Sequence, residues 1–262
     1  MTAEATKRPL EPDTIYNEDC LETMSRMPDC SVDLVVTSPP YDGMKSYNGY
    51  SFDFENVARE LFRIIKEGGV VVWVVGDETR AGDETGTSFR QALYFKEIGF
   101  RLFDTMIWHK PNSFNFGSND CYRQSFEYMF VLTKGKIATR NLIKDVPAKM
   151  AGRTVKGARR HVNGSRDTDV PDFVVPQYKR RDNVWDIMVA QERGTGKHPA
   201  VFPESLAADH ILSWSNPGEL VYDPFMGSGT VAKAAKALGR RFIGSEISAE
   251  YCRIADERLS KE

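Results

Sequence analysis

Two short polar segments follow apolar runs and carry the residue types best suited to chemistry. The first is Ser38-Pro39-Pro40-Tyr41, directly after the apolar run 32–36. A serine hydroxyl and a rigid proline carbonyl can each accept a hydrogen from an exocyclic amine of a nucleobase, which favours the pyramidal, nucleophilic form of the amine. Tyr41 offers a face on which a flipped base can stack. An ordinary strand-ending turn with a core tyrosine is the alternative for this segment alone.

The second segment is Asp223-Pro224-Phe225-Met226-Gly227-Ser228-Gly229-Thr230, and Glu246 lies 19 residues after Gly227. A strand, a glycine turn, a helix, a strand and an acid form a nucleoside-binding layout. The glycines allow a ligand to approach the backbone closely, and Glu246 can accept both ribose hydroxyls. The charge of Asp223 opposes a pyrophosphate and favours a cationic group, as found in S-adenosyl-L-methionine. The alternative is a tight turn that binds nothing.

Alternating strand and helix patterns predict the framework that holds these segments. Seven runs are typical of strands: 14–17, 32–36, 70–75, 100–108, 126–132, 219–222 and 241–244. Helical patterns cover 21–27, 54–67, 88–98, 231–238 and 251–259, with a further helical face between 202 and 214. We expect Gly68-Gly69 to end the second helix, 42–51 to form a mobile loop, and His210 to be packed rather than catalytic. The alternation predicts a mostly parallel sheet with helices on both faces.

The bulk composition restricts the class of protein. The chain has 262 residues and a formal net charge of −2, which fits one large domain or one domain with an insert. No apolar run approaches the roughly 18 residues that span a bilayer, and the polar start of the chain has no signal core, so we expect a cytoplasmic protein without membrane contact. The four cysteines lack C-x-x-C spacing, which argues against a zinc site and a disulfide scaffold.

One block departs from this pattern in charge and rhythm. Residues 134–181 contain 13 Lys or Arg and 4 Asp or Glu, a local charge of +9. Such a block in an acidic chain indicates contact with a polyanion. We interpret it as an insert that orders on nucleic acid and is disordered in the free protein. The candidates for guanine or phosphate contacts are Arg153, Arg159, Arg160, Arg166, Arg180 and Arg181.

Together the two motifs resemble those of the DNA amino-methyltransferases, which modify cytosine N4 or adenine N6. Their order, with the Ser38 motif first, then the basic insert, then the Asp223 motif, is similar to the permuted beta group. Further segments look like parts of the same family: Asn17-Glu18-Asp19-Cys20-Leu21, Trp108-His109-Lys110-Pro111-Asn112, Phe126-Glu127-Tyr128, Lys197-His198-Pro199 with Phe202-Pro203-Glu204, and Gly244-Ser245-Glu246 with Tyr251.

The resemblance implies a site-specific methyltransferase that uses S-adenosylmethionine, needs no metal and flips a base out of double-stranded DNA. It makes Ser38, Pro39, Pro40 and Tyr41 catalytic. It implies that these residues bind the cofactor: Asp19, Lys197, His198, Pro199, Asp223, Pro224, Phe225, Gly227, Ser228, Gly229, Thr230 and Glu246. A cognate restriction endonuclease and a second copy of the chain are further partners that the family allows.

The fold implied is a seven-stranded, mostly parallel, Rossmann-like methyltransferase sheet with one antiparallel strand and circularly permuted motif order. The two turns should lie side by side at the carboxyl edge of this sheet. We divide the chain into an N-terminal arm (1–14), a catalytic half (15–133), a basic target-recognition insert (134–182) and a cofactor-binding half (183–262).

The residue before Pro39-Pro40 bears on which base is modified. In the family, adenine enzymes mostly carry Asp or Asn there and cytosine-N4 enzymes mostly carry Ser, so Ser38 favours cytosine N4, with adenine N6 as the alternative. Cytosine C5 methylation is disfavoured because it needs a cysteine nucleophile, typically in Pro-Cys. Remoter alternatives are a non-catalytic DNA-binding protein of this fold, a methyltransferase of RNA or of a protein amide, and a nucleotide hydrolase.

Overall fold

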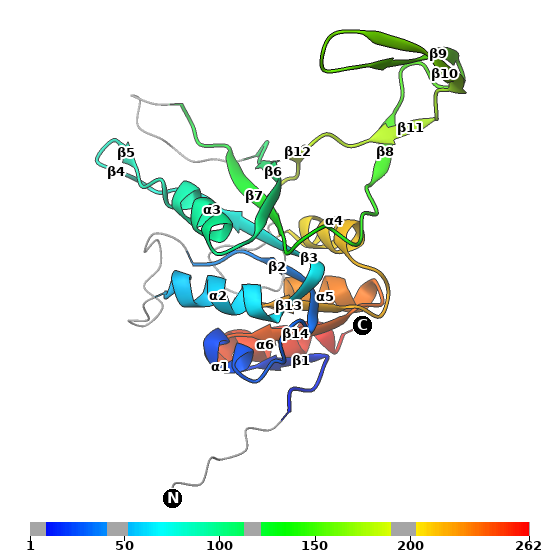
Figure 1. Ribbon diagram of the computed structural model, residues 1–262. Helices are drawn as coiled ribbons and strands as arrows, with labels where there is room; N and C mark the ends of the chain where they lie inside the picture. The colour runs from blue at the N-terminus through cyan, green and yellow to red at the C-terminus, as the bar shows by residue number, and fades with distance from the viewer. Residues whose placement is uncertain (1–8, 41–51, 113–121, 190–202, 262) are drawn as a thin grey trace, which may run out of the picture. The chain divides into compact units, whose positions relative to one another are not determined.

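The computed structural model describes residues 9–40, 52–112, 122–189 and 203–261 (Figure 1). They fall into two compact units, one made of Met1–Asn141 with Asn183–Glu262 and the other of Leu142–Asp182. Among the described helices, none has the length and apolar character that crossing a membrane requires.

The first unit is built on an eight-stranded sheet. Its strands in spatial order are β1 (Thr14–Tyr16), β14 (Arg241–Ser245), β13 (Leu220–Asp223), β2 (Val32–Thr37), β3 (Ile65–Val75), β7 (Phe126–Thr133), β6 (Arg101–His109) and β12 (Val184–Asp186). Only β7 runs antiparallel to its neighbours in this sheet. The seven expected strands are present, and the three-residue edge strand β12 is an eighth that its short sequence did not predict.

Helices cover both faces of this sheet, as the alternating pattern predicted. They are α1 (Cys20–Met24), α2 (Phe54–Ile64), α3 (Thr87–Glu97), α4 (Glu204–Trp214), α5 (Thr230–Ala237) and α6 (Ala249–Leu259). One buried cluster joins α1, α2 and α3 to the sheet, and the other joins α4 and α5 to it. A short hairpin of β4 (Thr79–Arg80) and β5 (Asp83–Glu84) precedes α3.

Asp13 also belongs to the fold, since its backbone N–H donates to the carbonyl of Phe242.

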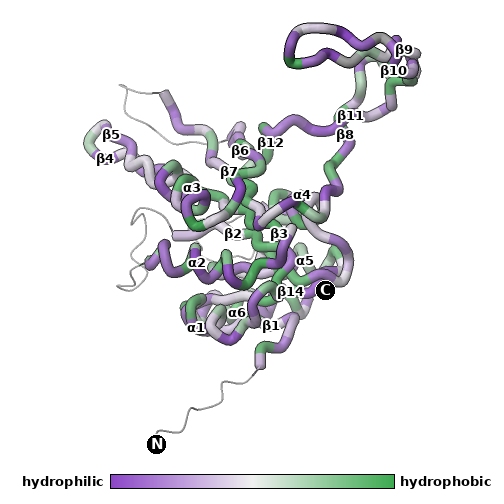
Figure 2. Tube along the Cα trace, in the orientation of Figure 1, coloured by the Kyte–Doolittle hydropathy of each residue, from purple (hydrophilic) through white to green (hydrophobic). Residues whose placement is uncertain are grey.

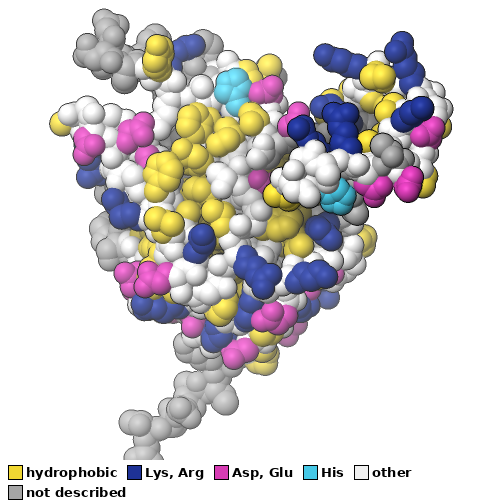
Figure 3. Space-filling view, turned by 45° about the horizontal axis from the view of Figure 1, so that its top comes forward, with side chains coloured by type: hydrophobic (Ala, Val, Ile, Leu, Met, Phe, Trp, Pro, Cys, Tyr) yellow, Lys and Arg dark blue, Asp and Glu magenta, His cyan; other side chains and the backbone are white. Residues whose placement is uncertain are grey.

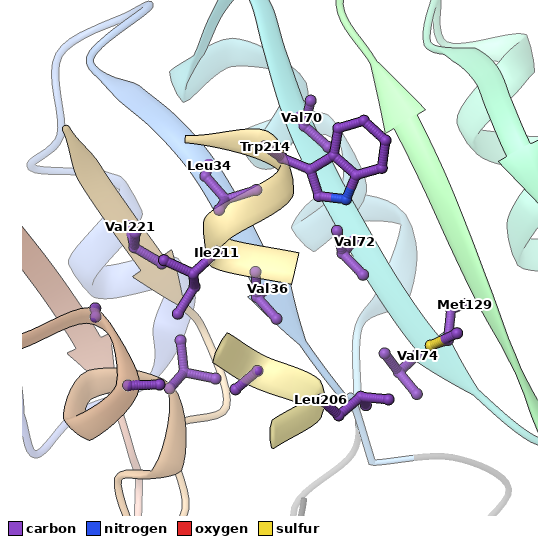
Figure 4. Close-up of a cluster of buried hydrophobic side chains, with 14 of the residues drawn as sticks. Leu34, Val36, Val70, Val72, Val74, Met129, Leu206, Ile211, Trp214 and Val221 are labelled. Atoms are coloured by element: carbon purple, nitrogen blue, oxygen red, sulfur yellow. The ribbon is translucent and has the colours of Figure 1, made fainter. Parts of the chain in front are cut away.

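Strand β2 lies at the centre of the packing and is apolar on both faces. Leu34 and Val36 belong to the cluster with α4 and α5, where Leu206 and Ile211 pack (Figure 4). Val35 faces the other cluster. In Figure 2 the hydrophobic colour follows the central strands of the sheet. A strand buried on both faces has a continuous apolar sequence, and for this reason β2 can be predicted from sequence.

The expected helix end at Gly68-Gly69 is wrong. Helix α2 ends at Ile64, and both glycines lie inside β3. Gly68 has a φ of +79°, and a Cβ on it would lie 2.8 Å from the Cβ of Ala138; a Cβ on Gly69 would lie 2.9 Å from the carbonyl oxygen of Asp33. The pair is therefore explained by close packing against neighbouring backbone, not by a helix cap.

The second unit consists of two antiparallel β-ribbons. Strand β8 (Lys144–Pro147) pairs with β11 (Tyr178–Arg180), and β9 (Thr154–Arg160) pairs with β10 (Arg166–Val174). We expected disorder here because apolar residues are few. The strands form nonetheless, since the backbone ladders are supported by apolar pairs such as Val155 opposite Phe173.

Candidate active site

The two motifs are adjacent at the carboxyl edge of the sheet, as predicted. Strands β2 and β13 pair in parallel through Leu34 with Val221 and Val35 with Tyr222, so both chains leave the sheet at the same edge. The Thr37 hydroxyl at the end of β2 donates a 2.6 Å hydrogen bond to Oδ1 of Asp223 at the end of β13. One buried hydrogen bond thus joins the residue before Ser38 to the first residue of the glycine turn.

The first turn presents a hydroxyl at the edge of the core. Strand β2 ends at Thr37, and Pro39 and Pro40 cannot continue the ladder because they lack N–H groups. Pro39 is buried, whereas Ser38 and Pro40 are half-buried. Among the described residues no group hydrogen-bonds to the Ser38 hydroxyl. Tyr41 and the expected loop 42–51 lie outside the described residues.

Asp223 is a buried acid with an unusual proton affinity. Its side chain accepts from Thr37 and from the backbone N–H of Phe225 at 3.0 Å, both at Oδ1. No described residue hydrogen-bonds to Oδ2. Burial raises the pKa of this carboxyl to about 7, although the bonds from Thr37 and Phe225 act in the opposite direction. The acid can therefore change charge near neutral pH, and it is suited to a cationic partner.

The glycine turn adopts the backbone conformation that its glycines allow. Gly227 and Gly229 have φ values of +54° and +82°, and Gly229 is the N-cap of α5. A Cβ on Gly229 would lie 2.7 Å from the Cβ of Ala255 in α6. Arg258 of α6 donates to the carbonyl of Ser228 at 2.7 Å and to its hydroxyl at 3.0 Å. Helix α6 therefore fixes the turn from behind.

Glu246 closes the site from the end of β14. Its Oε2 accepts from the N–H of Gly227 at 2.9 Å, and its Oε1 accepts from the N–H of Ser248 at 2.8 Å. Burial raises the pKa of this carboxyl, against the effect of these backbone donors. Each oxygen retains capacity for a further donor, so the carboxylate can accept hydroxyl groups while it holds the turn.

The segment after β1 lies beside Glu246. The Asn17 side chain donates to the carbonyl of Glu246 at 2.8 Å, and the N–H of Glu246 donates to the carbonyl of Tyr16 at 3.0 Å. Asp19 is the N-cap of α1 and accepts from the N–H of Leu21 at 2.7 Å. The structure thus brings Asp19 to the same edge as the glycine turn, by way of the pairing of β1 with β14.

Phe225 connects the glycine turn to an aromatic cluster. Its half-buried ring lies edge-on to Phe52, with ring centroids 5.3 Å apart, and 6.3 Å from Trp73. Phe52 is the first described residue after the segment 41–51. The ring of Phe225 therefore packs the glycine turn against Phe52 and against Trp73, which is the register partner of Thr37 in β3.

The remaining predicted residues fall into separate groups. Pro224, Ser228 and Thr230 are buried in the glycine turn. Lys197, His198 and Pro199 lie outside the described residues. His210 is buried in α4, where Trp214 donates to it at 3.2 Å and burial lowers its pKa to about 3, so the expectation that it is packed is confirmed.

The predicted DNA-contacting arginines all belong to the second unit. Arg153, Arg160, Arg166 and Arg180 are exposed. Arg181 forms an ion pair with Asp145, with its Nε 2.9 Å from both carboxylate oxygens.

Sequence reasoning assigned no role to three residues that hold the site together: Thr37, Asn17 and Arg258. Thr37 stands next to the Ser38 motif, so its position was a usable signal. Asn17 and Arg258 act on residues 229 and 30 positions away, and nothing local marks such partners.

Comparison with known proteins by sequence finds relatives of one kind. A family model described as DNA methylase, of the N6/N4 class, matches residues 32–257. The orphan methyltransferase M.BamHII of Bacillus amyloliquefaciens is 53% identical over 238 residues, covering 88% of this chain and 89% of that protein. The type II methyltransferase M.BglII of Bacillus subtilis is 30% identical over 258 residues, covering 95% of this chain and 69% of that protein.

Solved structures give the same fold. The DNA modification methylase TTHA0409 of Thermus thermophilus, in complex with S-adenosyl-L-methionine, is 26% identical with a TM-score of 0.65, covering 94% of this chain and 93% of that one. The cytosine-N4-specific PvuII DNA methyltransferase has a TM-score of 0.69 at 21% identity, covering 96% of this chain and 87% of that one, a likeness in fold.

Proposed function

The chain belongs to the DNA methylase family of the N6/N4 class, and from this premise we propose that it transfers a methyl group from S-adenosylmethionine to N4 of a cytosine in double-stranded DNA. The observation that carries the proposal is the hydrogen bond between Thr37 and Asp223. It places the hydroxyl turn and the glycine turn next to each other, as a transfer between two bound molecules requires.

The chemistry of the glycine-turn side fits the cofactor. Glu246 would accept the ribose hydroxyls, and Oδ2 of Asp223 would face the cationic amino acid group. Asp19 would lie on the adenine side, and the closely packed glycine turn lets the backbone approach the ligand. The bound cofactor supplies a methyl group activated by its positive sulfur. TTHA0409, whose structure contains S-adenosyl-L-methionine, supports this assignment.

The hydroxyl-turn side would activate the amine. The Ser38 hydroxyl and the Pro39 carbonyl accept the two amine hydrogens, and Tyr41 stacks on the flipped base. Held in this way, the amine would present its nitrogen lone pair to the methyl carbon that the cofactor supplies; transfer would leave the sulfur as a neutral thioether and pass one amine proton to water. Because the amine of a nucleobase is a weak nucleophile, this positioning supplies much of the rate.

The choice of cytosine N4 over adenine N6 rests on Ser38. A neutral hydroxyl stands where the family's adenine enzymes mostly carry a carboxylate or an amide. The second unit supplies the DNA contacts, because its exposed arginines provide the positive charge that a phosphate backbone attracts. Lys197, His198 and Pro199 complete the cofactor side in this proposal.

The experiment uses methyl-labelled S-adenosylmethionine and duplex DNA, followed by digestion to nucleosides and mass spectrometry. We expect labelled N4-methylcytosine. We further predict that Ser38→Ala lowers the transfer rate by more than about 100-fold, within the range that positioned groups contribute, while cofactor affinity by calorimetry stays unchanged.

The matched control is Ser31→Ala, which removes a half-buried serine just before the other end of β2, where its hydroxyl donates to the carbonyl of Pro28 at 2.7 Å. It should retain full transfer activity. Label in N6-methyladenine would replace the base assignment, and full activity of Ser38→Ala would remove the catalytic role of that hydroxyl.

A further inference from the structure

The β9–β10 ribbon places two arginines directly opposite each other. Arg160 ends β9 and Arg166 begins β10, and the two are register partners. Between them the turn 161–165 is closed by a 2.9 Å bond from the N–H of His161 to the carbonyl of Ser165, and by the positive φ of Gly164. Both arginines are exposed. Residues opposite each other in a ribbon project from the same face, with Cβ atoms about 4.5–5.5 Å apart.

This pair is unfavourable in the free protein. Like charges directly opposite in a ribbon repel each other. Among the described residues neither guanidinium forms an ion pair, whereas Arg181 in the same unit is paired with Asp145. The next register pair, Arg159 with Asp167, joins residue types of opposite charge. A hydrogen-bond acceptor on another molecule would relieve the repulsion between the guanidinium groups of Arg160 and Arg166.

The charged residues are distributed unevenly between the two strands of the ribbon. Residues 146–166 contain six Lys or Arg and no Asp or Glu, whereas Asp167, Asp169 and Asp172 all lie on β10 beyond the pair. Lys and Arg side chains gather on this unit (Figure 3). Register shifts between Asp167 and Val170, and between Val170 and Phe173, mark irregular pairing that increases the twist of a ribbon. Arg160 and Arg166 lie at the tip, the part of a ribbon that can reach furthest into a groove.

We propose that Arg160 and Arg166 read guanine in the major groove of the DNA substrate. This inference rests on the proposed function, since it takes duplex DNA as the ligand. The major groove admits a two-stranded ribbon, and an arginine fork fits O6 and N7 of guanine with two hydrogen bonds. Two forks on one face of the tip then read two guanines. Arg153 precedes β9 at the opposite end from the tip, and it contacts phosphate.

The experiment compares Arg160→Gln, Arg166→Gln and the control Arg153→Gln in the full-length protein. Each is incubated with S-adenosylmethionine and a randomised duplex library, and the modified sites are sequenced. We expect a wild-type recognition motif that contains guanine. Each tip variant should lose about 10- to 100-fold of its discrimination at one guanine, the range for one bidentate contact. Arg160→Lys should lose it too, because it keeps the charge without the fork.

The control distinguishes base-specific contacts from non-specific attraction to phosphate. Arg153→Gln should weaken binding equally for all sequences and reduce the slope of log K against log salt by about 1. Unchanged discrimination in both tip variants, with only a lower salt slope, would make them phosphate contacts and overturn the inference. A wild-type motif without guanine would also overturn it. Failure of the wild type to modify DNA at all would instead count against the proposed function.

Discussion

At the scale of single residues, Asp223 combines two roles in the site. It accepts the bond from Thr37 that joins the two turns, and it carries a raised pKa of about 7. In most proteins a buried acid of this kind would be paired with a cation. Here the described residues supply only neutral donors to it, so a cationic ligand group is the partner that its chemistry calls for.

This assignment predicts a pH-dependent cofactor affinity. Ionised Asp223 attracts the cationic amino group, so affinity should fall as pH is lowered through about 7, by up to about tenfold per pH unit. Calorimetry between about pH 5.5 and about pH 7.5 would measure it. Asp223→Asn should bind weakly throughout and lack this dependence. The ligand's own amino group titrates near about 7.7–8.0, so it is mostly protonated over this range and adds little to either curve. Equal curves for the two proteins would contradict the role of Asp223.

At the scale of elements, the hydrogen bond between the ends of β2 and β13 both joins the two strands and affects the charge of Asp223. The hydroxyl of Thr37 lowers the pKa of Asp223 by stabilising its ionised form. Thr37→Val should therefore raise that pKa above about 7 and move the pH midpoint of cofactor binding upward. It should also cost about 1 kcal/mol of folding stability, the usual value of a hydrogen bond.

A threonine at the opposite edge of the sheet provides the control. Thr133 is also buried, ends β7, and donates from its hydroxyl to the carbonyl of Gly135 at 3.2 Å. Thr133→Val should cost similar stability and leave the pH midpoint in place. A midpoint that moves equally in both variants would show that the shift reflects general loosening of the sheet.

Helix α5 allows a second test at this scale, because a glycine stands near each of its ends. Gly229 and Gly239 both have positive φ, at +82° and +71°. A Cβ on Gly229 meets Ala255 at 2.7 Å, whereas a Cβ on Gly239 meets nothing within 4 Å. Gly239→Ala should cost about 1 kcal/mol from backbone strain. Gly229→Ala should cost about 1–3 kcal/mol more, because of overpacking.

Thermal unfolding of the two variants would measure this difference, and calorimetry would show a loss of cofactor affinity only for Gly229→Ala. If both variants unfolded at the same temperature, the close approach of α5 and α6 would not constrain the turn.

Features that depend on neighbouring residues can be predicted from sequence, whereas contacts between residues far apart in the chain cannot. Buried strands such as β2 and β13 appear as continuous apolar runs, and adjacent carboxyl ends follow from parallel pairing. The bond from Thr37 to Asp223 spans 186 positions, so no local pattern contains it. Gly68 was interpreted as a helix cap because a glycine after a helical run looks the same whether it caps or packs. An insert was predicted at 134–182, but its strands were not, because few of its residues are apolar and most are exposed.

At the scale of the whole molecule, charge is divided between the two compact units. The second unit, residues 142–182, contains 10 Lys or Arg and 5 Asp or Glu, a net +5, and the rest of the chain therefore carries −7. An acidic surface repels phosphate and a basic one attracts it. The affinity for DNA should therefore depend on salt concentration through the charges of the insert. The affinity for the cofactor should depend on salt far less, because Asp223 and Glu246, the acids proposed to bind it, are buried.

Charge removal tests this division. Replacing the exposed Lys149 and Lys156 of the insert by Gln should reduce the slope of log K for DNA against log salt by up to about 2, because each phosphate contact contributes roughly 0.9. The matched control removes two exposed lysines of the other unit, Lys96 and Lys261. Its slope should equal that of the wild type, as measured by fluorescence anisotropy. Equal reductions in both double variants would mean that only net charge matters.

The measurement that tests the central claim most directly is sequencing of DNA from cells that express the chain, by a method that separates N4-methylcytosine from N6-methyladenine. We predict N4-methylcytosine at one recognition motif, with the mark lost in cells that express Ser38→Ala. N6-methyladenine at a motif would contradict the inference from Ser38. Absence of any mark, from a protein that binds S-adenosylmethionine, would contradict the proposal that DNA is the substrate.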